Sequence, residues 1–131
     1  MDTDQTIDVF DSDLGQTAIP VANSDLLSLA DTNLAEVNLV GARLEKADLA
    51  RATLIKANLQ KANLAEATLS EADLSGAFLT EANLSMSNLT RTNLTLANLT
   101  LADLTGADLS GAVLCEAFFN GASLAGANLS G

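Results

Sequence analysis

A period of five residues runs through most of this chain and limits what it can fold into. From Leu29 to Leu129 every fifth residue is leucine, with Phe119 as the exception. The residue two places before each leucine is usually alanine, and the residue one place before it is usually asparagine or aspartate. The unit is therefore Ala-(Asn/Asp)-Leu-x-x, repeated from about residue 27 to residue 131. Such self-similarity indicates a repeat architecture.

Neither an α-helix nor a flat strand can bury a pattern of this period. On a helix, leucines five residues apart rotate by about 140° per step and spread around the cylinder. On a strand they alternate between the two faces, because five is odd. A coil that turns one corner per unit instead places one leucine and one small residue of each unit inside. The predicted core consists of Leu34, Leu39, Leu44, Leu49, Leu54, Leu59, Leu64, Leu69, Leu74, Leu79, Leu84, Leu89, Leu94, Leu99, Leu104, Leu109, Leu114, Phe119 and Leu124.

The run ADLARATLIKANLQKANLAEATLSEADLSGAFLTEANL resembles the pentapeptide repeat family. The resemblance covers about 105 of the 131 residues, as 21 tandem units. It implies an all-β fold, a right-handed quadrilateral parallel β-helix with four units in each coil. Residues 27–131 would then form about five coils, preceded by a separate N-terminal segment over 1–26.

The charged residues test how long a coil is. With 20-residue coils, the fifth residues of units 20 positions apart stack on one another, and cross-strand neighbours favour opposite charges. Six such pairs have opposite signs: Asp31 with Arg51, Arg51 with Glu71, Glu71 with Arg91, Glu36 with Lys56, Lys46 with Glu66 and Lys61 with Glu81. A 15-residue coil would stack like charges, whereas a 25-residue coil passes the same test. The charges therefore exclude three-sided coils and leave four-sided and five-sided ones open.

The two ends of the chain depart from the simple repeat. Residues 1–26 carry six aspartates and no basic residue, which favours an acidic cap or a partly ordered leader over a binding arm. At the other end the repeats continue to Leu129 without a polar cap, which solenoids normally require. We therefore expect a homodimer through the C-terminal coil, with Phe118, Phe119, Leu124 and Leu129 at the contact, as in some family members. A monomer with a frayed last coil is the alternative.

Large apolar residues also occupy positions that should face outward. Met86, Leu96 and Leu101 stand where other units carry charges or glycine. With 20-residue coils, Phe78 and Phe118 share a column on either side of Asn98, a placement that favours widening or wedging of a corner. The edge between Leu96 and Leu101 is a candidate partner footprint.

The composition argues against catalysis and against bound cofactors. The chain has no histidine, so Cys115 has no imidazole to activate it, and no metal or cofactor site is predicted. A net charge of -11 disfavours direct binding to nucleic acid phosphates. No signal peptide and no membrane span are recognisable, so we expect a cytoplasmic protein without a membrane association.

Two functions remain, and both are kinds of protein binding. The first is a rigid interaction or scaffold module whose partner is unassigned. The second follows from the resemblance, because the Qnr and MfpA groups of the family bind DNA gyrase as acidic mimics of duplex DNA. Residues 27–131 carry eleven acidic and six basic residues, which is a lower charge density than that of DNA. Asp103, Asp108 and Glu116 follow the last basic residue and form the candidate acidic partner face.

Overall fold

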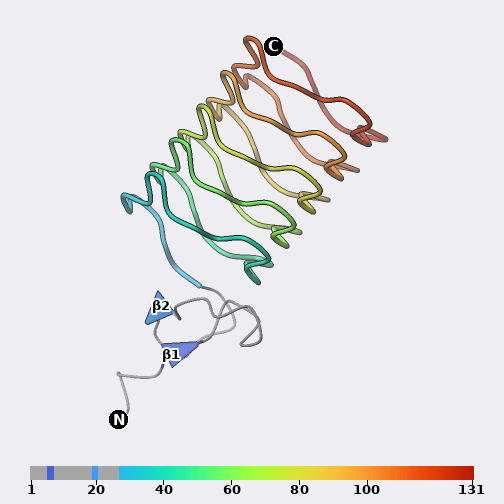
Figure 1. The fold of residues 1–131 in the computed structure, drawn as a ribbon. Coiled ribbons are helices and arrows are strands. Elements are labelled where there is room, and N and C mark those ends of the chain that lie inside the picture. Colours follow the sequence, from blue (N-terminus) through green and yellow to red (C-terminus); the bar gives the residue numbers. More distant parts are fainter. Residues whose placement is uncertain (1–5, 8–18, 21–26) are drawn as a thin grey trace.

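The structure is a computed structural model that describes residues 6–7, 19–20 and 27–131 (Figure 1). Near the N-terminus, strand β1 (Thr6–Ile7) pairs antiparallel with strand β2 (Ile19–Pro20). In this pairing Thr6 lies opposite Pro20, and Ile7 lies opposite Ile19. The predicted cap or leader over 1–26 lies largely outside the described residues and stays a prediction.

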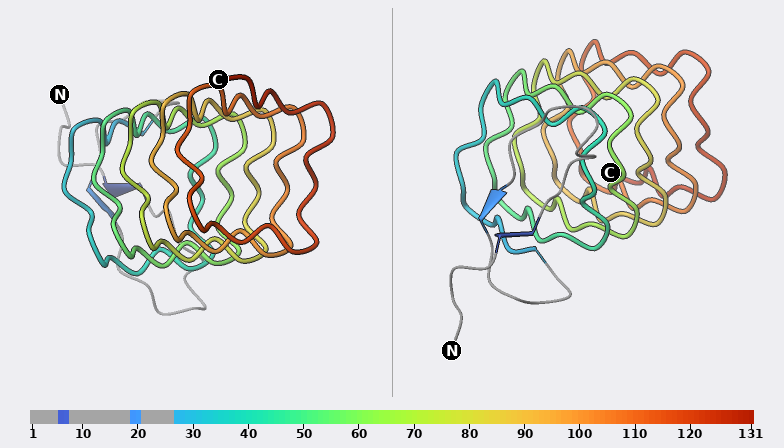
Figure 2. Two further views of the ribbon diagram at one scale, coloured as in Figure 1. Left: turned by 90° about the horizontal axis from the view of Figure 1, so that it is seen from above. Right: turned by 60° about the horizontal axis from the view of Figure 1, so that its bottom comes forward.

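Residues 27–131 form a four-sided tube in which each coil stacks on the one before (Figures 1 and 2). Parallel bridges join the second residue of a unit to the matching residue four units later, from Ser28 with Asp48 to Asp108 with Asn128. A coil therefore contains four units, which confirms the quadrilateral coil and excludes the five-sided alternative. At the usual strand spacing of about 4.8 Å, the tube is about 25 Å long.

The backbone of the tube is hydrogen-bonded in the same way in each unit that has asparagine or aspartate at its second position and a coil on either side, as residues 57–61 illustrate. The first N–H bonds across the corner, the second, third and fifth bond to neighbouring coils, and the fourth bonds to a side chain. The donor–acceptor pairs are Ala57 to Leu54 (3.0 Å), Asn58 to Val37 (2.9 Å), Leu59 to Phe78 (2.7 Å), Gln60 to the Asn58 side chain (3.2 Å) and Lys61 to Thr80 (3.0 Å). All five donors of the unit are thus satisfied, as a packed backbone requires.

Each corner of the tube is a tight turn with a left-handed residue. The carbonyl of the leucine accepts the N–H three residues later, as in Ala77 to Leu74 at 3.0 Å. Every fifth residue from Asp31 to Gly131 has a positive φ, between 56° and 61° for the residues that are not glycine. A positive φ at the third of four turn residues is typical of type II turns. Each such residue other than glycine costs roughly 1–2 kcal/mol, which the bonds between the coils must offset.

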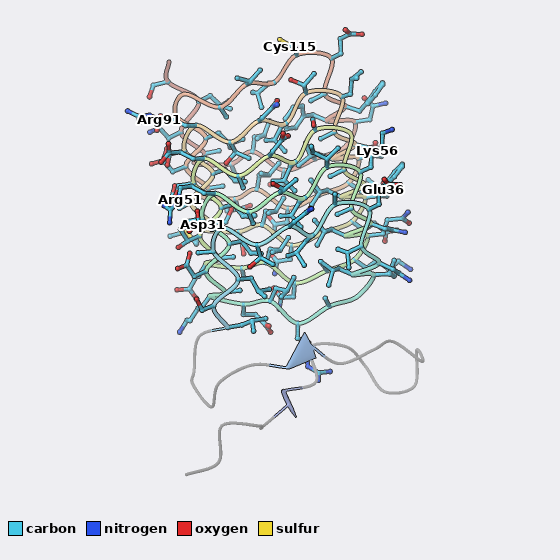
Figure 3. The ribbon with its side chains drawn as sticks, turned by 90° about the vertical axis from the view of Figure 1, so that its left-hand side faces the viewer. Asp31, Glu36, Arg51, Lys56, Arg91 and Cys115 are labelled. Atoms are coloured by element: carbon cyan, nitrogen blue, oxygen red, sulfur yellow. The ribbon has the colours of Figure 1, made fainter. Side chains whose placement is uncertain are left out.

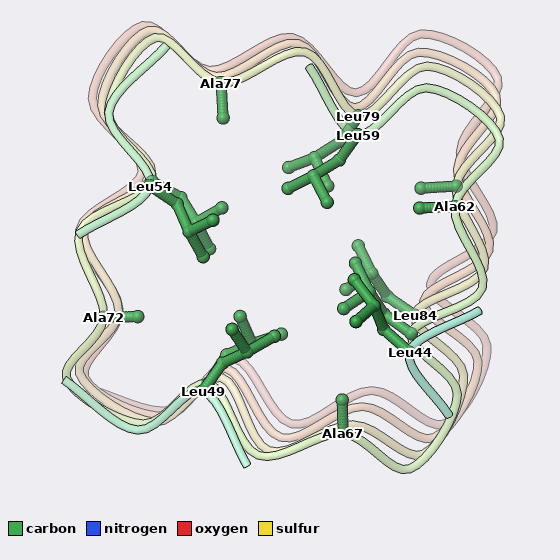
Figure 4. Close-up of a cluster of buried hydrophobic side chains, with 14 of the residues drawn as sticks. Leu44, Leu49, Leu54, Leu59, Ala62, Ala67, Ala72, Ala77, Leu79 and Leu84 are labelled. Atoms are coloured by element: carbon green, nitrogen blue, oxygen red, sulfur yellow. The ribbon is translucent and has the colours of Figure 1, made fainter. Parts of the chain in front are cut away.

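The interior of the tube is filled by leucine and alanine (Figure 4). From Leu39 to Leu109, each leucine of the repeat is at most 2% exposed. Ser87 and Thr92 replace alanine at two inward positions, and their hydroxyls donate to the carbonyls of Leu84 and Leu69 at 2.7 Å. Because both hydroxyls are bonded, burying them costs little.

The inward residues are less covered at the two ends of the tube. Leu34 in the first coil is half-buried, as are Leu114, Phe119 and Leu124 in the last one, and all four pack against the buried cluster. Among residues 27–131, each of them has a neighbouring coil on one side only. Leu129, in the final unit, is 51% exposed.

Candidate interaction surface

The second position of the unit explains why asparagine and aspartate recur there. In thirteen units the side-chain Oδ1 accepts the backbone N–H two residues later, at 2.9–3.2 Å. The residues that do so are Asn33, Asn38, Asp48, Asn58, Asn63, Asp73, Asn83, Asn88, Asn93, Asn98, Asp103, Asp108 and Asn128. These Asx turns complete the backbone bonding of the corner. The sequence shows the recurrence of these residues, and the structure shows that they act as hydrogen-bond acceptors.

Two members of the candidate acidic face are therefore engaged in turns. Asp103 accepts the Thr105 N–H at 2.9 Å, and hydrogen bonds from the Thr105 hydroxyl and amide lower the pKa of its carboxyl. Asp108 accepts the Ser110 N–H at 2.9 Å, and its pKa is lowered by the bonds from Ser110 and then by the one from Asn128. Both carboxyls are thus held ionised, with one oxygen turned to the backbone.

The candidate acidic face does not form one flat side. Asp103 bridges Ser123 and Asp108 bridges Asn128, which places the two aspartates on adjacent sides of the tube. Glu116 occupies a corner one side further along, at a φ of 56°. The three carboxylates therefore point in different directions and offer no shared surface to one partner.

Charged corner columns follow the stacking that the sequence predicted. Arg51 forms two hydrogen bonds with Asp31, at 2.8 Å from Nε and 2.9 Å from the terminal nitrogen, and these bonds lower the pKa of Asp31. Glu36 and Lys56 follow one another along the next corner, which bounds the other edge of the side that begins at Asp31 and Arg51 (Figure 3). Exposed pairs of this kind contribute little to stability, and we interpret them as marks of register.

One side of the tube carries most of the exposed apolar residues. Phe78 and Phe118 lie in one column, because both bridge Asn98. Leu96 and Leu101 occupy the two corners that bound this side, since turns close from Ala97 to Leu94 and from Ala102 to Leu99. We call Phe78, Leu96, Leu101 and Phe118 the apolar side; they are 44%, 52%, 58% and 52% exposed.

The apolar side changes the roles that the sequence suggested for the two phenylalanines. Both stand at the bridging position in the middle of a side, so they do not wedge a corner. Phe118 points outward from this side, whereas Phe119 is inward and half-buried. Phe118 therefore points out of one side of the tube, within its last coil, and its predicted contact in a dimer through that coil stays a prediction. Leu96 and Leu101, chosen as one edge, instead bound the whole side.

Sites for small ligands are poorly developed on the described residues. A shallow open depression of about 640 Å³ follows the corner of Arg91 and is lined by hydroxyl groups and Glu71. Within residues 27–131 no group of three or more Cys, Asp or Glu residues is placed to hold a metal ion. Cys115 is exposed and free. The described part of the chain also contains no helix long and apolar enough to cross a bilayer.

Comparison with known proteins agrees with this geometry. The family model for pentapeptide repeats matches residues 28–64, 62–100 and 102–131. No curated protein is significantly similar to the chain. Among solved structures, the pentapeptide repeat protein alr5209 from Nostoc PCC 7120 is 36% identical, with a TM-score of 0.66, over 78% of this chain and 84% of that one.

Two further solved structures are similar to the chain in different degrees. Rfr23 from the cyanobacterium Cyanothece 51142 is 29% identical over 79% of this chain and 90% of its own, with a TM-score of 0.44. QnrB1, a plasmid-mediated fluoroquinolone resistance protein, is 17% identical over 79% of this chain and 65% of its own, with a TM-score of 0.59. At that identity the likeness to QnrB1 concerns the fold alone. The tube is a right-handed quadrilateral β-helix, and the chain belongs to the pentapeptide repeat family.

Proposed function

We propose that the chain is a rigid, non-enzymatic module that binds other proteins through the flat sides of its tube. The observation that carries this proposal is the division of labour within each unit. The first and third residues fill the interior, the second bonds the corner in thirteen units, and the remaining positions face solvent. A surface on a backbone this fully bonded is preorganised, which reduces the entropy lost on binding.

The same geometry gives little support to chemistry. A nucleophile needs a base within hydrogen-bond reach, and the chain has no histidine to serve Cys115. The depression beside Arg91 is open and polar rather than enclosed. Ligand sites are usually concave and largely apolar, so protein contact fits these surfaces better than a small substrate does.

The DNA-mimic alternative gains no specific support. Residues 27–131 carry a net charge of about -5, from eleven acidic and six basic residues. Spread along a tube of about 25 Å, this is roughly one charge per 5 Å, whereas duplex DNA carries one charge per ~1.7 Å. Basic residues at the corners, such as Arg51 beside Asp31, divide the negative charge further. Asp103 and Asp108 are also engaged in turns on different sides.

Exchanging residues within one column tests the proposal without disturbing the fold. We would make four variants, one for each side of the tube. In each variant the outward residues of that side are replaced by residues that occupy the same column in another coil. The tagged full chain and these variants would capture proteins from a lysate of the source organism, with thermal melting as the folding control. We expect one captured protein to be lost with one variant only. Identical capture by all five proteins, or none, would contradict a side-specific binding module.

A supercoiling assay with purified DNA gyrase separates the two functions. We expect neither inhibition nor protection of the enzyme at micromolar concentrations of the chain. Inhibition that disappears in the variants of one side would instead support the DNA-mimic alternative.

A further inference from the structure

The apolar side is costly for the folded monomer, which suggests that it has another purpose. Its central column contains Asn58 and Asn98, which bond the backbone, whereas Phe78 and Phe118 have no side-chain acceptor and forgo that bond. Both phenylalanines remain about half exposed, so burial does not compensate for it. The two corner columns that flank this side contain Lys56 and Lys61 in an earlier coil. Two coils later the same columns contain Leu96 and Leu101.

The four side chains make one patch. Phe78 and Phe118 flank the coil of Asn98, one on each side, and Leu96 and Leu101 stand at the two edges of that coil. Since coils are about 4.8 Å apart, the two phenylalanines lie about 10 Å apart. Each phenylalanine exposes on the order of 100 Å², and the patch as a whole roughly 400 Å². That size matches the largest apolar patch of a typical monomer, and such patches are often binding sites.

We propose that a second copy of this chain covers the apolar side, with the two tubes antiparallel. The two-fold axis would lie in the interface, perpendicular to both tubes, and pass over Asn98. This rotation reverses the order of the coils, and each edge of the apolar side faces the same edge of the partner subunit. Phe78 then meets the partner subunit's Phe118, while Leu96 and Leu101 each meet their own counterpart.

The charges around the patch favour this arrangement. On the two edges, Glu81 meets the partner subunit's Gly121, and Glu116 meets the partner subunit's Gly76. Neither carboxylate therefore faces a like charge. A parallel dimer also stacks the phenylalanines, but it places Lys56 opposite the partner subunit's Lys61 on both edges. Like charges in an interface cost free energy and disfavour that alternative.

The size of the patch sets the expected strength of the dimer. Two copies would bury about 800 Å² of apolar surface from these side chains, below the ~1,000 Å² that a stable specific interface needs. We therefore expect a weak dimer that dissociates on dilution. The proposal concerns self-association and does not depend on the proposed binding function.

Sedimentation velocity over a concentration series tests the surface with substitutions the fold already accepts. Leu96→Lys and Leu101→Lys copy Lys56 and Lys61 of the same columns, and Phe118→Asn copies Asn98. We expect each to weaken dimerisation at least tenfold without lowering the melting temperature. Met86→Lys, which copies Lys46 on another corner, is the matched control and should leave the dimer unchanged. A wild-type chain that stays monomeric at millimolar concentration would overturn the proposal.

Single cysteines test the orientation of the two copies. In a Cys115→Ser background, which copies Ser75 of that column, Leu101→Cys should form an intermolecular disulfide because the antiparallel axis brings position 101 to itself. Lys61→Cys is the matched control, two coils away in the same column, and should remain reduced. A parallel dimer would leave both cysteines unlinked. A dimer that ignores all these variants would indicate contact through the terminal coil, and the proposal would be wrong.

Discussion

Leu74→Ala should destabilise the tube by more than most truncations of a buried leucine do. Leu74 is fully buried in a column between Leu54 and Leu94. Its own N–H bonds to Asn93 of the next coil at 2.8 Å, and the N–H of Asp73 bonds to the preceding coil at 3.0 Å. Because the backbone is tied to both neighbouring coils, the wall has little freedom to collapse into the cavity. We therefore expect a loss of about 3 to 5 kcal/mol, the upper part of the range for buried leucines.

Urea unfolding and thermal melting measure this loss. For a domain of this length, each kcal/mol lowers the melting temperature by about 4 °C, so Leu74→Ala should lower it by about 10 °C or more. Leu124→Ala is the matched control, because Leu124 is half-buried in the last coil and should cost about 1 to 2 kcal/mol. Equal losses for the two variants, or a loss below about 1 kcal/mol at Leu74, would refute the reasoning.

Three further predictions concern the corners. Asn98→Ala removes a turn acceptor at 3.0 Å and should cost about 1 kcal/mol in urea unfolding, unlike a neutral surface change. The pKa of Asp108 is lowered below 3.8 in the folded chain, so its stabilisation is complete above that pH and is lost as the pH falls through the folded value. Asp108→Asn keeps the acceptor, and its melting temperature should fall less steeply in acid than that of the wild type. Gly121→Ala sets a Cβ 2.7 Å from Leu101 Cδ2, whereas at Gly126, with a similar φ of 70°, the nearest atom is 3.9 Å away. Gly121→Ala should therefore melt at a lower temperature than Gly126→Ala; equal melting would show that Leu101 moves aside freely.

The tube itself could be predicted from the sequence because every unit repeats the same physical problem. A leucine at every fifth residue excludes the helix and the flat strand, and the resemblance supplied the four-sided coil. The charge columns alone left the coil length open, since opposite charges recur at a spacing of four units and again at five. The bridge from Ser28 to Asp48 decides it, and that bridge depends on backbone bonds that no side-chain pattern specifies.

The surfaces were harder to predict, because neighbours in the sequence lie on different sides of a coil. Asp103 and Asp108 belong to successive units and are therefore one corner apart. Their position after the last basic residue of the sequence had suggested one acidic face. Phe78 and Phe118 are separated by two full coils of sequence and share a column, as the 20-residue coil predicted. Residues that are neighbours on the surface of this fold are found by counting in whole coils, which means in steps of four units.

The corner columns show why such a fold suits a change of binding chemistry without a change of shape. Asp31, Arg51, Glu71 and Arg91 succeed one another at one corner, with φ between 56° and 60° in all four. The same backbone therefore holds either charge, and glycine follows in the column at Gly111 with φ of 70°. Since the leucines fill the core and the Asx turns complete the hydrogen bonding of the corners, an outward residue can change without loss of stability. Phe118 lacks the turn bond and is also 52% exposed, as a contact residue would be, and exchange within a column separates its effect on binding from its effect on folding.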